Sequence, residues 1–451
     1  MAADSAGGSP AARRDRAVRA AVEQGLVGSG DGAEPLVCLL DTDGIRASAA
    51  ALRAAFAGAL PSDTPVLHAF AVKAAPLVPV LRLLADAGIG CEVASPGELA
   101  LARAAGVPPA RIVLDSPAKT PEELGEALAL GVAVNADNRQ ELERLDGLVA
   151  AGPTASPLGV RVNPQLGAGT IEATSTATAT SKFGVALRDP GAREWLVRAY
   201  LERPWLTRLH THSGSQGVPL PLIAEGVRVL YELAEEINAA AGRRQVDTLD
   251  IGGGLPVNFA SDAESPTYAE YAAALREAAP GLFSGRYGLV TEFGRSLLAK
   301  HGLVLARVEY TKTSGGRPIA LTHAGVHLLT RTVYAPASWP LRVLAYDAKG
   351  APKTGAAVPQ DIAGPACFSG DLVAADRALP ELAPGDLIAV PDTGAYFFTA
   401  HYGYNSLPRP AVYGFTAAPG GGRVRFALAR AAQTRADLLR ESGAPQRDAL
   451  L

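Results

Sequence analysis

Short apolar runs alternate with stretches of helical periodicity from about residue 43 to residue 300. The apolar runs are 66–72, 112–115, 131–135, 159–163, 207–211, 247–251 and 288–292. The helical stretches between them include 76–87, 97–105, 121–130 and 221–241. In the last stretch, one face at helical spacing is formed by Ile223, Val227, Leu230, Leu233 and Ile237. Repeated strand–helix units predict parallel strands joined by helical crossovers.

The length of this alternating region favours a closed barrel. It is close to the roughly 250 residues of a (β/α)8 barrel. A doubly wound open sheet is the alternative, but no GxGxxG motif opens the first strand–helix unit. After about residue 300, the strand-like runs 303–311, 341–347, 386–392 and 424–429 are separated by turns rich in Gly and Pro. We therefore predict an α/β fold, a (β/α)8 barrel followed by a mainly β C-terminal domain.

The same pattern predicts the domain boundaries. Residues 1–35 form an N-terminal extension that is partly disordered, and the barrel covers 36–300, with 36–42 able to join the β domain instead. The β domain covers 301–430, and 431–451 form a C-terminal tail. Inside the barrel, the Thr- and Ala-rich stretch 170–180 is expected to be a mobile loop that faces the active site.

Composition narrows the class of protein without identifying it. The 451 residues are 48% apolar and 19% charged, which is typical of a globular protein. A net charge of −3 gives no electrostatic reason to expect nucleic acid or an anionic membrane as a partner. Three cysteines (Cys38, Cys91 and Cys367) are too few for a disulfide framework. Without a signal-like or membrane-spanning apolar stretch, we expect a cytoplasmic protein.

The first motif that could take part in catalysis or cofactor binding is AVKAAP, residues 71–76, in which Lys73 directly follows an apolar strand. A charge that leaves a strand for solvent is the simplest explanation. At the C-terminal mouth of a barrel, however, catalytic groups collect. A partly desolvated lysine there can form an imine with an aldehyde cofactor.

The motifs LHTHSGSQ (209–216) and LDIGGGLP (249–256) follow two later strands. The two histidines have a spacing that also permits metal ligation, but no Asp, Glu or Cys cluster accompanies them in the sequence, so we expect no metal. The His212 ring can stack on a flat cofactor, and Ser215 and nearby amides can reach a phosphate. Successive glycines let the backbone approach an anion closely, although a flexible turn is an equally simple explanation.

Three further motifs complete the set. In TEFGRS (291–296), Glu292 ends a strand and Arg295 follows it, so the two form either a structural ion pair or a pair that faces a cofactor. A carboxylate that bonds a pyridine nitrogen keeps that nitrogen protonated. The stretches GPACFSGD (364–371) and DTGAYFFTAHYGYNSLPRP (392–410) contain Cys367 and Tyr396, which taken alone would be a small buried hydrophobe and a packed aromatic.

Together and in this order, the six motifs resemble those of the barrel-type, alanine-racemase-fold decarboxylases that use pyridoxal 5'-phosphate (PLP). This family includes diaminopimelate, ornithine and arginine decarboxylases, and the C-terminal motifs most resemble those of the diaminopimelate enzymes. The resemblance spans about residues 36–415 and extends to SPGEL (95–99), RVNP (161–164), SKFG (181–184) and YNSLPRP (404–410).

The resemblance implies a role for each residue. Lys73 would form the imine with PLP, His212 would stack on its ring, and Glu292 would bond its pyridine nitrogen. The implied phosphate ligands are Ser215, Gly252, Gly253, Gly254 and Tyr396, with Arg295 contacting phosphate or substrate carboxylate. Cys367 would come from the partner subunit of a homodimer with shared active sites and would reprotonate the substrate carbon. The implied substrate contacts are Arg295, Arg331, Phe368 and Tyr396.

Three positions depart from the family pattern. Phe368 stands where diaminopimelate decarboxylases have a glutamate, and ornithine decarboxylases an aspartate, for the distal amine of the substrate. Arg331 matches the arginine for the distal carboxylate, but Ala335 replaces the tyrosine expected four residues later, with Tyr334 one residue early. Glu92 replaces an aspartate. Because an unpaired ammonium in a closed site costs several kcal/mol, Phe368 predicts poor turnover of substrates with a distal amine.

From this pattern we expect a PLP-dependent carboxy-lyase that removes the α-carboxylate of an amino acid or amino-acid conjugate. The altered pocket favours a substrate outside lysine biosynthesis, within a specialised biosynthetic pathway. Three alternatives stay open: an authentic meso-diaminopimelate decarboxylase, an amino-acid racemase, and a non-catalytic PLP-binding regulator. Racemases of this fold place an arginine opposite the pyridine nitrogen, so Glu292 disfavours the second.

Overall fold

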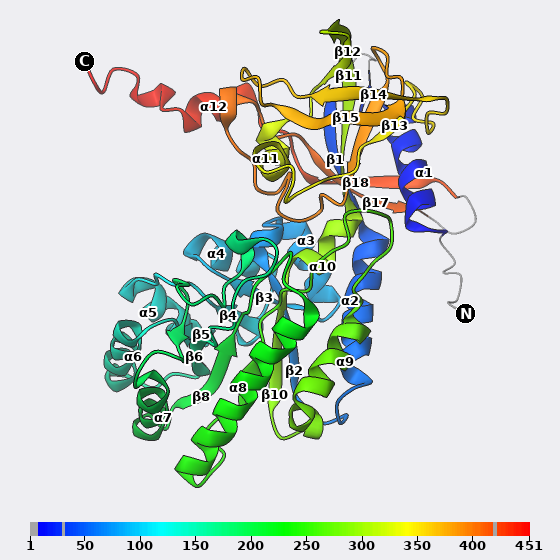
Figure 1. Ribbon diagram of the computed structural model, residues 1–451. Helices are drawn as coiled ribbons and strands as arrows, with labels where there is room; N and C mark the ends of the chain where they lie inside the picture. Colours follow the sequence, from blue (N-terminus) through cyan, green and yellow to red (C-terminus); the bar gives the residue numbers. More distant parts are fainter. Residues whose placement is uncertain (1–7, 29–31, 418–421) are drawn as a thin grey trace. The chain divides into compact units, whose positions relative to one another are not determined.

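The computed structural model describes residues 8–28, 32–417 and 422–451 (Figure 1). The disorder predicted for the start of the N-terminal extension falls largely on residues 1–7, which lie outside the described residues. Within the predicted extension, Ser9 caps helix α1 (Pro10–Glu23) by accepting a hydrogen bond from the Ala12 amide.

The described chain divides into two compact units. The β unit comprises the residues up to Ile45, Asn258–Ala263 and Leu298–Leu451, and the barrel unit comprises Arg46–Val257 and Glu264–Leu297. The chain therefore leaves the β unit twice to build the barrel unit. The domain boundaries predicted at residues 36, 300 and 430 stay predictions.

Eight parallel strands close the barrel of the barrel unit (Figure 1). They are β2 (Val66–Ala71), β3 (Gly90–Val93), β4 (Ile112–Leu114), β5 (Ala133–Ala136), β6 (Leu158–Asn163), β8 (Leu206–Thr211), β9 (Thr248–Asp250) and β10 (Gly288–Phe293). The pairing of β5 with β6 completes the ring, and the two-residue β7 (Val185–Ala186) adds to β6. The predicted barrel is confirmed, and the open-sheet alternative is wrong because the two outermost strands of such a sheet would not pair.

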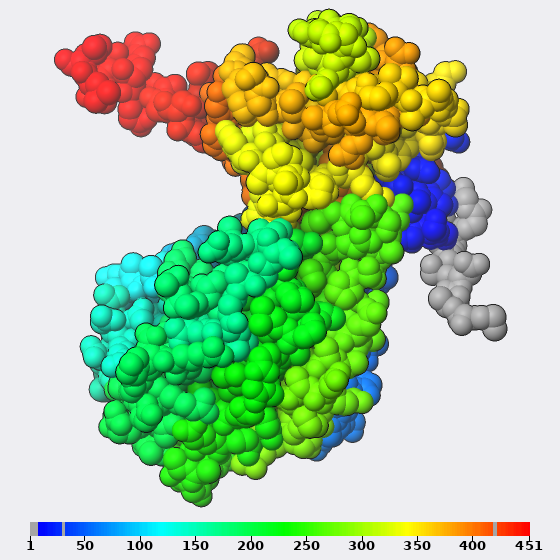
Figure 2. Space-filling view, viewed as in Figure 1, coloured from blue at the N-terminus to red at the C-terminus, as the bar shows by residue number. Residues whose placement is uncertain are grey.

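Helices surround this barrel, and they make up much of the surface of the barrel unit that Figure 2 shows. They are α2 (Thr42–Ala57), α3 (Val78–Asp86), α4 (Pro96–Ala104), α5 (Pro121–Leu130), α6 (Arg139–Ala151), α7 (Ala192–Glu202), α8 (Leu220–Ala241), α9 (Tyr268–Ala278) and α10 (Arg295–Leu298). The apolar face predicted within 221–241 is buried, from Ile223 to Ile237, which confirms that prediction. None of the helices in the described part of the chain has the length and hydropathy of a membrane-spanning segment.

The β unit contains a nine-stranded mixed sheet, as the predicted β domain requires. Its strands are β1 (Leu36–Asp41), β11 (Gly302–Ser314), β12 (Arg317–Thr322), β13 (Leu344–Tyr346), β14 (Ala357–Ala363), β15 (Leu372–Pro380), β16 (Leu387–Pro391), β17 (Val412–Ala417) and β18 (Val424–Arg430). Helices α1, α11 (Val326–Tyr334) and α12 (Arg435–Glu441) belong to the same unit. Strand β1 pairs with β11 and β17, so it joins this sheet rather than the barrel.

Two local features of the barrel unit differ from the sequence-based expectation. Strand β3 is not predicted by the sequence, because its four residues contain a glycine and a glutamate and have no apolar periodicity. The stretch 170–180, expected to be a mobile loop, contains a short 3₁₀ helix (Glu172–Thr174). The Ser215 amide donates to the Thr174 carbonyl at 2.9 Å, which fixes this stretch against the segment that follows β8.

Candidate active site

Lys73 lies just beyond the carboxyl end of β2, in a short 3₁₀ helix (Val72–Ala74). Its Nζ donates to Oε2 of Glu92 on β3, whose side chain is buried. The Lys73 side chain is 48% exposed, so the amine is tethered by the carboxylate yet reachable from solvent. Burial raises the pKa of Glu92, and the Lys73 charge acts against that rise. Glu92 therefore orients the amine that the sequence analysis assigned to the cofactor.

His212 and Gly253 connect the segments that follow β8 and β9. The Gly253 amide donates to Nδ1 of His212 at 3.1 Å, which leaves the proton of the neutral ring on Nε2. Burial, followed by the charges of Arg161 and Lys73, lowers the pKa of His212 well below its usual value. A neutral, oriented imidazole is suited to stacking on an aromatic ring.

The glycines after β9 are required by close backbone approach. A Cβ on Gly253 would overlap the Glu292 carbonyl oxygen, and one on Gly254 would overlap the Gly214 carbonyl. Gly252 (φ +64°) and Gly254 (φ +99°) also adopt left-handed conformations. The Gly252 carbonyl accepts a 2.7 Å hydrogen bond from the Glu292 amide, so this turn is fixed directly against β10. Such a turn can present backbone amides to an anion such as phosphate.

Glu292 is a buried acid near the end of β10, and the buried Arg295 begins α10 three residues later. Burial raises the pKa of Glu292 well above its usual value, and the nearby carboxylates of Asp250, Asp115 and Glu92 raise it further. Before any cofactor binds, burial and these carboxylates therefore favour the protonated form of Glu292.

A set of charged side chains that the sequence analysis did not single out surrounds Glu292. Asp115 follows β4, Arg161 lies on β6, His210 on β8 and Asp250 on β9, and all four are buried. The expectation that no Asp, Glu or Cys cluster accompanies the two histidines is wrong for the folded chain. One nitrogen of His210 and one oxygen each of Asp115, Asp250 and Glu292 lie within 4.8 Å of one another. These residues come from four separate strands, so no local spacing could reveal them.

The remaining predicted site residues lie in the β unit. The Arg331 guanidinium on α11 lies 4.9 Å from the Tyr396 ring centre and 5.0 Å from that of Trp339. Tyr396 has a φ of +65°, a conformation that is uncommon for a large side chain and is typical of functional loops. The positive φ of Tyr396 therefore indicates a role for this residue beyond simple packing.

Cys367 and Phe368 occupy a turn of the same unit. Cys367 is exposed, and its amide donates to Asn405 Oδ1 at 2.7 Å. The Phe368 ring stacks on Tyr334 with centroids 5.9 Å apart and meets Tyr404 edge-on at 5.3 Å. The expectation that an isolated Cys367 would be buried is wrong, because an asparagine holds this turn at the surface.

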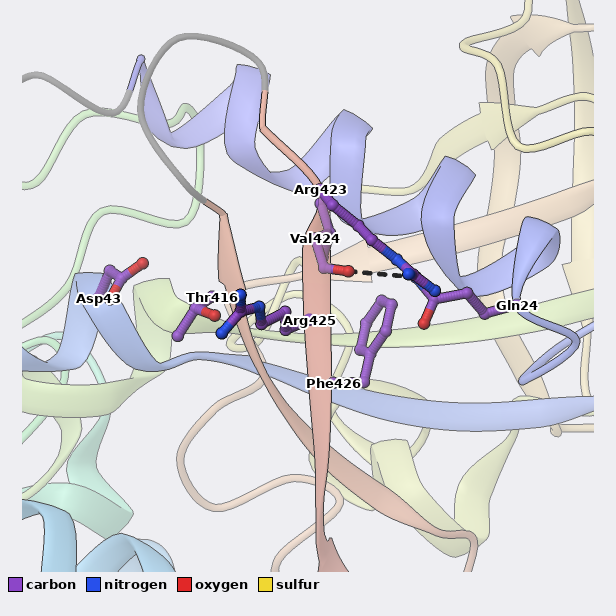
Figure 3. Close-up of a pocket in the computed structure, with 7 residues that line it drawn as sticks. All are labelled: Gln24, Asp43, Thr416, Arg423, Val424, Arg425 and Phe426. Carbon is purple, nitrogen blue, oxygen red and sulfur yellow. Dashed lines mark hydrogen bonds between the residues drawn. The ribbon is translucent and has the colours of Figure 1, made fainter.

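A pocket of about 750 Å³ in the β unit contains none of these residues (Figure 3). It is lined by Gln24, Asp43, Thr416, Arg423, Val424, Arg425 and Phe426. Gln24 donates to the Val424 carbonyl at 3.1 Å, which ties the residue after α1 to β18. The size of this pocket alone does not make it the reaction site, since the side chains that could take part in a reaction lie elsewhere.

A closed parallel barrel with an accessible lysine, a neutral histidine, a glycine turn and a buried acid at the ends of its strands defines a barrel-type PLP enzyme. The chain belongs to the pyridoxal-dependent decarboxylases: the model of the pyridoxal binding domain of this family matches residues 45–299. It is accordingly a PLP-dependent amino-acid decarboxylase, which confirms the predicted family, enzyme class and cofactor.

Individual relatives agree with this assignment. The chain is 35% identical to a diaminopimelate decarboxylase of Pseudomonas aeruginosa over 368 residues, which are 81% of this chain and 85% of that protein. A crystal structure of diaminopimelate decarboxylase from Helicobacter pylori complexed with L-lysine matches with a TM-score of 0.79 and 26% identity, over 92% of this chain and 98% of that one. A lysine/ornithine decarboxylase of Vibrio vulnificus complexed with cadaverine matches with a TM-score of 0.68 and 25% identity, over 84% and 94%.

The state of Glu292 predicts how stability depends on pH in the protein freed of PLP. Its folded-state pKa is raised, so as pH rises past about 4.5 the unfolded chain loses this proton before the folded chain does. The folded state then binds more protons, and the free energy of unfolding falls with pH, by at most about 1.4 kcal/mol per pH unit for this group. Glu292→Gln should therefore lose less stability than the unmodified protein between pH 5 and pH 8 in urea titrations.

The exposed Glu122→Gln on α5 is the control for the loss of one carboxyl group, and it should follow the unmodified protein. Parallel pH dependences for Glu292→Gln and the unmodified protein would show that Glu292 is not protonated in the folded state.

Proposed function

We propose that the chain removes the α-carboxylate of a diaminopimelate-type amino acid, with meso-diaminopimelate as the first candidate substrate. The observation that carries this proposal is the similarity to diaminopimelate decarboxylases over about four fifths of the chain. Arg331, which is partly buried between two aromatic rings, is the group we assign to the distal carboxylate. The family matches give no support to the racemase and non-catalytic alternatives.

The residues of the barrel unit fit PLP. An accessible amine, a neutral imidazole, a turn in which side chains would not fit and a buried acid match, in order, its aldehyde, its ring face, its phosphate and its pyridine nitrogen. When bound, PLP accepts the electron pair that remains on the α-carbon after carbon dioxide leaves. We assign Lys73 to the aldehyde, with Glu92 orienting its amine, and His212 to the ring face.

The other residues would bind the phosphate and move protons. Ser215, Gly252, Gly253, Gly254 and Tyr396 are the phosphate ligands that we propose, with Arg295 on the phosphate or the substrate carboxylate. Glu292 would share its proton with the pyridine nitrogen. The Cys367 thiol of a second copy of the chain would return a proton to the α-carbon, since this residue is exposed in its own chain. The proposal therefore includes a homodimer, and we infer a cytoplasmic location from the composition.

A second candidate function is favoured by one observation, Phe368. In place of a carboxylate for a distal ammonium, the chain places a phenyl ring that stacks on Tyr334 and contacts Tyr404. This arrangement favours an amino acid or amino-acid conjugate without a distal ammonium, as a specialised biosynthetic pathway would supply. Arg331 would then select a distal end that is anionic or amide-like.

The attachment of PLP provides the first test. Lys73→Ala should abolish decarboxylation and the near-visible absorption of the cofactor, because no other amine is assigned to its aldehyde. After borohydride reduction, peptide mass spectrometry of the unmodified protein should locate the cofactor on the peptide that contains Lys73. Lys312→Ala, at an exposed position on β11, is the control that should retain both signals. Labelling of another lysine in the unmodified protein would contradict the assignment.

Substrate choice separates the two candidate functions. We expect the unmodified enzyme to release carbon dioxide from meso-diaminopimelate with kcat/KM of about 10⁴ M⁻¹s⁻¹ or higher, as metabolic enzymes do. The second candidate predicts a loss of about a hundred- to a few-thousand-fold, the cost of an unpaired buried charge. It also predicts that Phe368→Glu raises this value whereas the uncharged Phe368→Gln does not. Poor turnover together with a gain in Phe368→Glu would overturn diaminopimelate as the substrate.

Shared active sites can be tested by subunit mixing. Lys73→Ala and Cys367→Ala should each be inactive, and their random mixture should recover about a quarter of the original activity, because half of the dimers are mixed and each has one intact site. Lys73→Ala mixed with His212→Ala is the matched control. Both of those changes fall in the barrel unit, so every site stays defective. Equal activity in the two mixtures would argue against sites shared in this way.

A further inference from the structure

His210 lies at the centre of the buried charges that surround Glu292. Its Nε2 is 3.0 Å from Asp115 Oδ2 and 4.0 Å from Glu292 Oε2, and its Nδ1 is 3.3 Å from Asp250 Oδ1. The side chain has no exposed surface. None of the roles assigned above uses this histidine, although it lies next to the acid assigned to the cofactor nitrogen.

We propose that His210 is a positioning residue which, as an imidazolium between Asp115 and Asp250, keeps the Glu292 carboxylate ionised and oriented when it meets the pyridine nitrogen of PLP. The inference deepens the proposed function, because it rests on the role assigned there to Glu292.

The contacts of both ring nitrogens favour the charged form of His210. A neutral imidazole has one N–H, so one of its nitrogens would place a lone pair against a carboxylate oxygen. The imidazolium presents an N–H on each side. Neither contact is aligned well enough to count as a hydrogen bond, so the attraction is that of close ion pairs. Burial alone would lower the pKa of His210, but Asp115 and Asp250 outweigh it and raise the pKa.

The neighbouring groups agree with this assignment. Burial acts to raise the pKa of Asp115, but the charges of His210 and Arg161 outweigh it and lower this pKa to about 2. Asn135 on β5 donates to Oδ2 of Asp250 at 3.3 Å, whereas His210 contacts the other oxygen, Oδ1. The titratable or charged groups around His210 are Asp115 after β4, Arg161 on β6, His212 after β8, Asp250 on β9 and Glu292 on β10. Among these neighbours of His210, Arg161 is the cation.

The consequence for Glu292 follows from charge balance. Burial and the charges of Asp250, Asp115 and Glu92 disfavour ionisation of Glu292, and the charge of Lys73 favours it. Nε2 of His210 lies 4.0 Å from Glu292 Oε2, so its positive charge stabilises a carboxylate at that position. Without this cation, the proton shared by Glu292 and the pyridine nitrogen would move towards Glu292. The ring would then accept electrons less readily.

A metal ion would be a different explanation for the same cluster. One histidine and three carboxylates can ligate a divalent ion, but an ion needs its ligand atoms about 2.0–2.2 Å away, on different sides of it. Here Asp115 approaches Nε2 of His210 at 3.0 Å and Asp250 approaches Nδ1 at 3.3 Å. The two carboxylates thus lie at different ring nitrogens, whereas a single ion binds only one nitrogen of a histidine, so the metal content of the purified protein separates the two explanations.

The charge of His210 can be measured without substrate or PLP. In protein labelled with ¹⁵N-histidine and freed of PLP, the ring of His210 should show the imidazolium signal at pH 7. Its resonance is assigned by its loss in His210→Asn. His68 is the internal control, because it is also buried in the barrel but contacts Thr291 at 2.9 Å, and burial lowers its pKa to about 4. A neutral His210 at pH 7, or a stoichiometric divalent metal in the purified protein, would overturn the proposal.

Charge rescue separates positioning from simple packing. His210→Asn should weaken PLP binding, measured by equilibrium dialysis, and lower kcat by about tenfold or more, since each pKa unit of mismatch corresponds to a factor of ten. The double variant His210→Asn/Asp115→Asn removes one negative charge as well, and it should recover part of both losses. His68→Asn should leave the pH dependence of the cofactor spectrum unchanged. A double variant no better than His210→Asn alone would contradict a role through charge.

These outcomes are independent of the substrate assignment. If meso-diaminopimelate is not turned over, the histidine titration and the PLP affinities still decide the role of His210. If PLP binds through another lysine, the proposed function fails while the imidazolium signal is unaffected.

Discussion

The structure of the barrel unit depends on a balance of buried charges. Moving an ionised side chain from water into a protein interior costs several kcal/mol unless a partner of opposite charge accompanies it. In this barrel the anions Glu92 and Asp115 meet the cations Lys73 and His210. Removing one member leaves another unpaired, so these residues are energetically linked although they come from different strands. The site is therefore specified by the whole barrel and not by any one motif.

In the β unit, ion pairs hold an otherwise unfavourable backbone. Asp392 and Tyr396 both have positive φ values, and they bracket the turn after β16. The buried Asp392 carboxylate is 3.0 Å from Lys300 Nζ and 2.9 Å from an Arg342 nitrogen. Such conformations cost of order 1–3 kcal/mol each and persist only where surrounding contacts enforce them. The ion pairs hold the backbone at Asp392, where the turn that carries Tyr396 begins.

The sequence predicted the barrel because parallel strands buried on both faces appear as continuous apolar runs between helical repeats. It also predicted those site residues that lie in local motifs directly after strands, such as Lys73 and the glycines after β9. Asp115, Arg161 and Asp250 could not be found in this way. Asp115 and Asp250 are single polar residues at the end of apolar strands and Arg161 lies within one, and only barrel closure brings them around His210. Likewise, the exposure of Cys367 depends on Asn405, a distant residue in the sequence.

The order of the chain has a consequence for synthesis. Leu36 in β1 pairs with Ala306 in β11, and the barrel unit lies between them in the sequence. At about 5–20 residues per second, a ribosome needs roughly 15–50 s to deliver that partner. The barrel can fold during this interval, whereas β1 waits with unpaired hydrogen-bonding groups and apolar side chains, a state that invites aggregation. In a nascent chain that stalls before β11, the barrel would thus be folded while β1 still exposes its apolar side chains. We therefore expect chaperones to bind β1 at this stage.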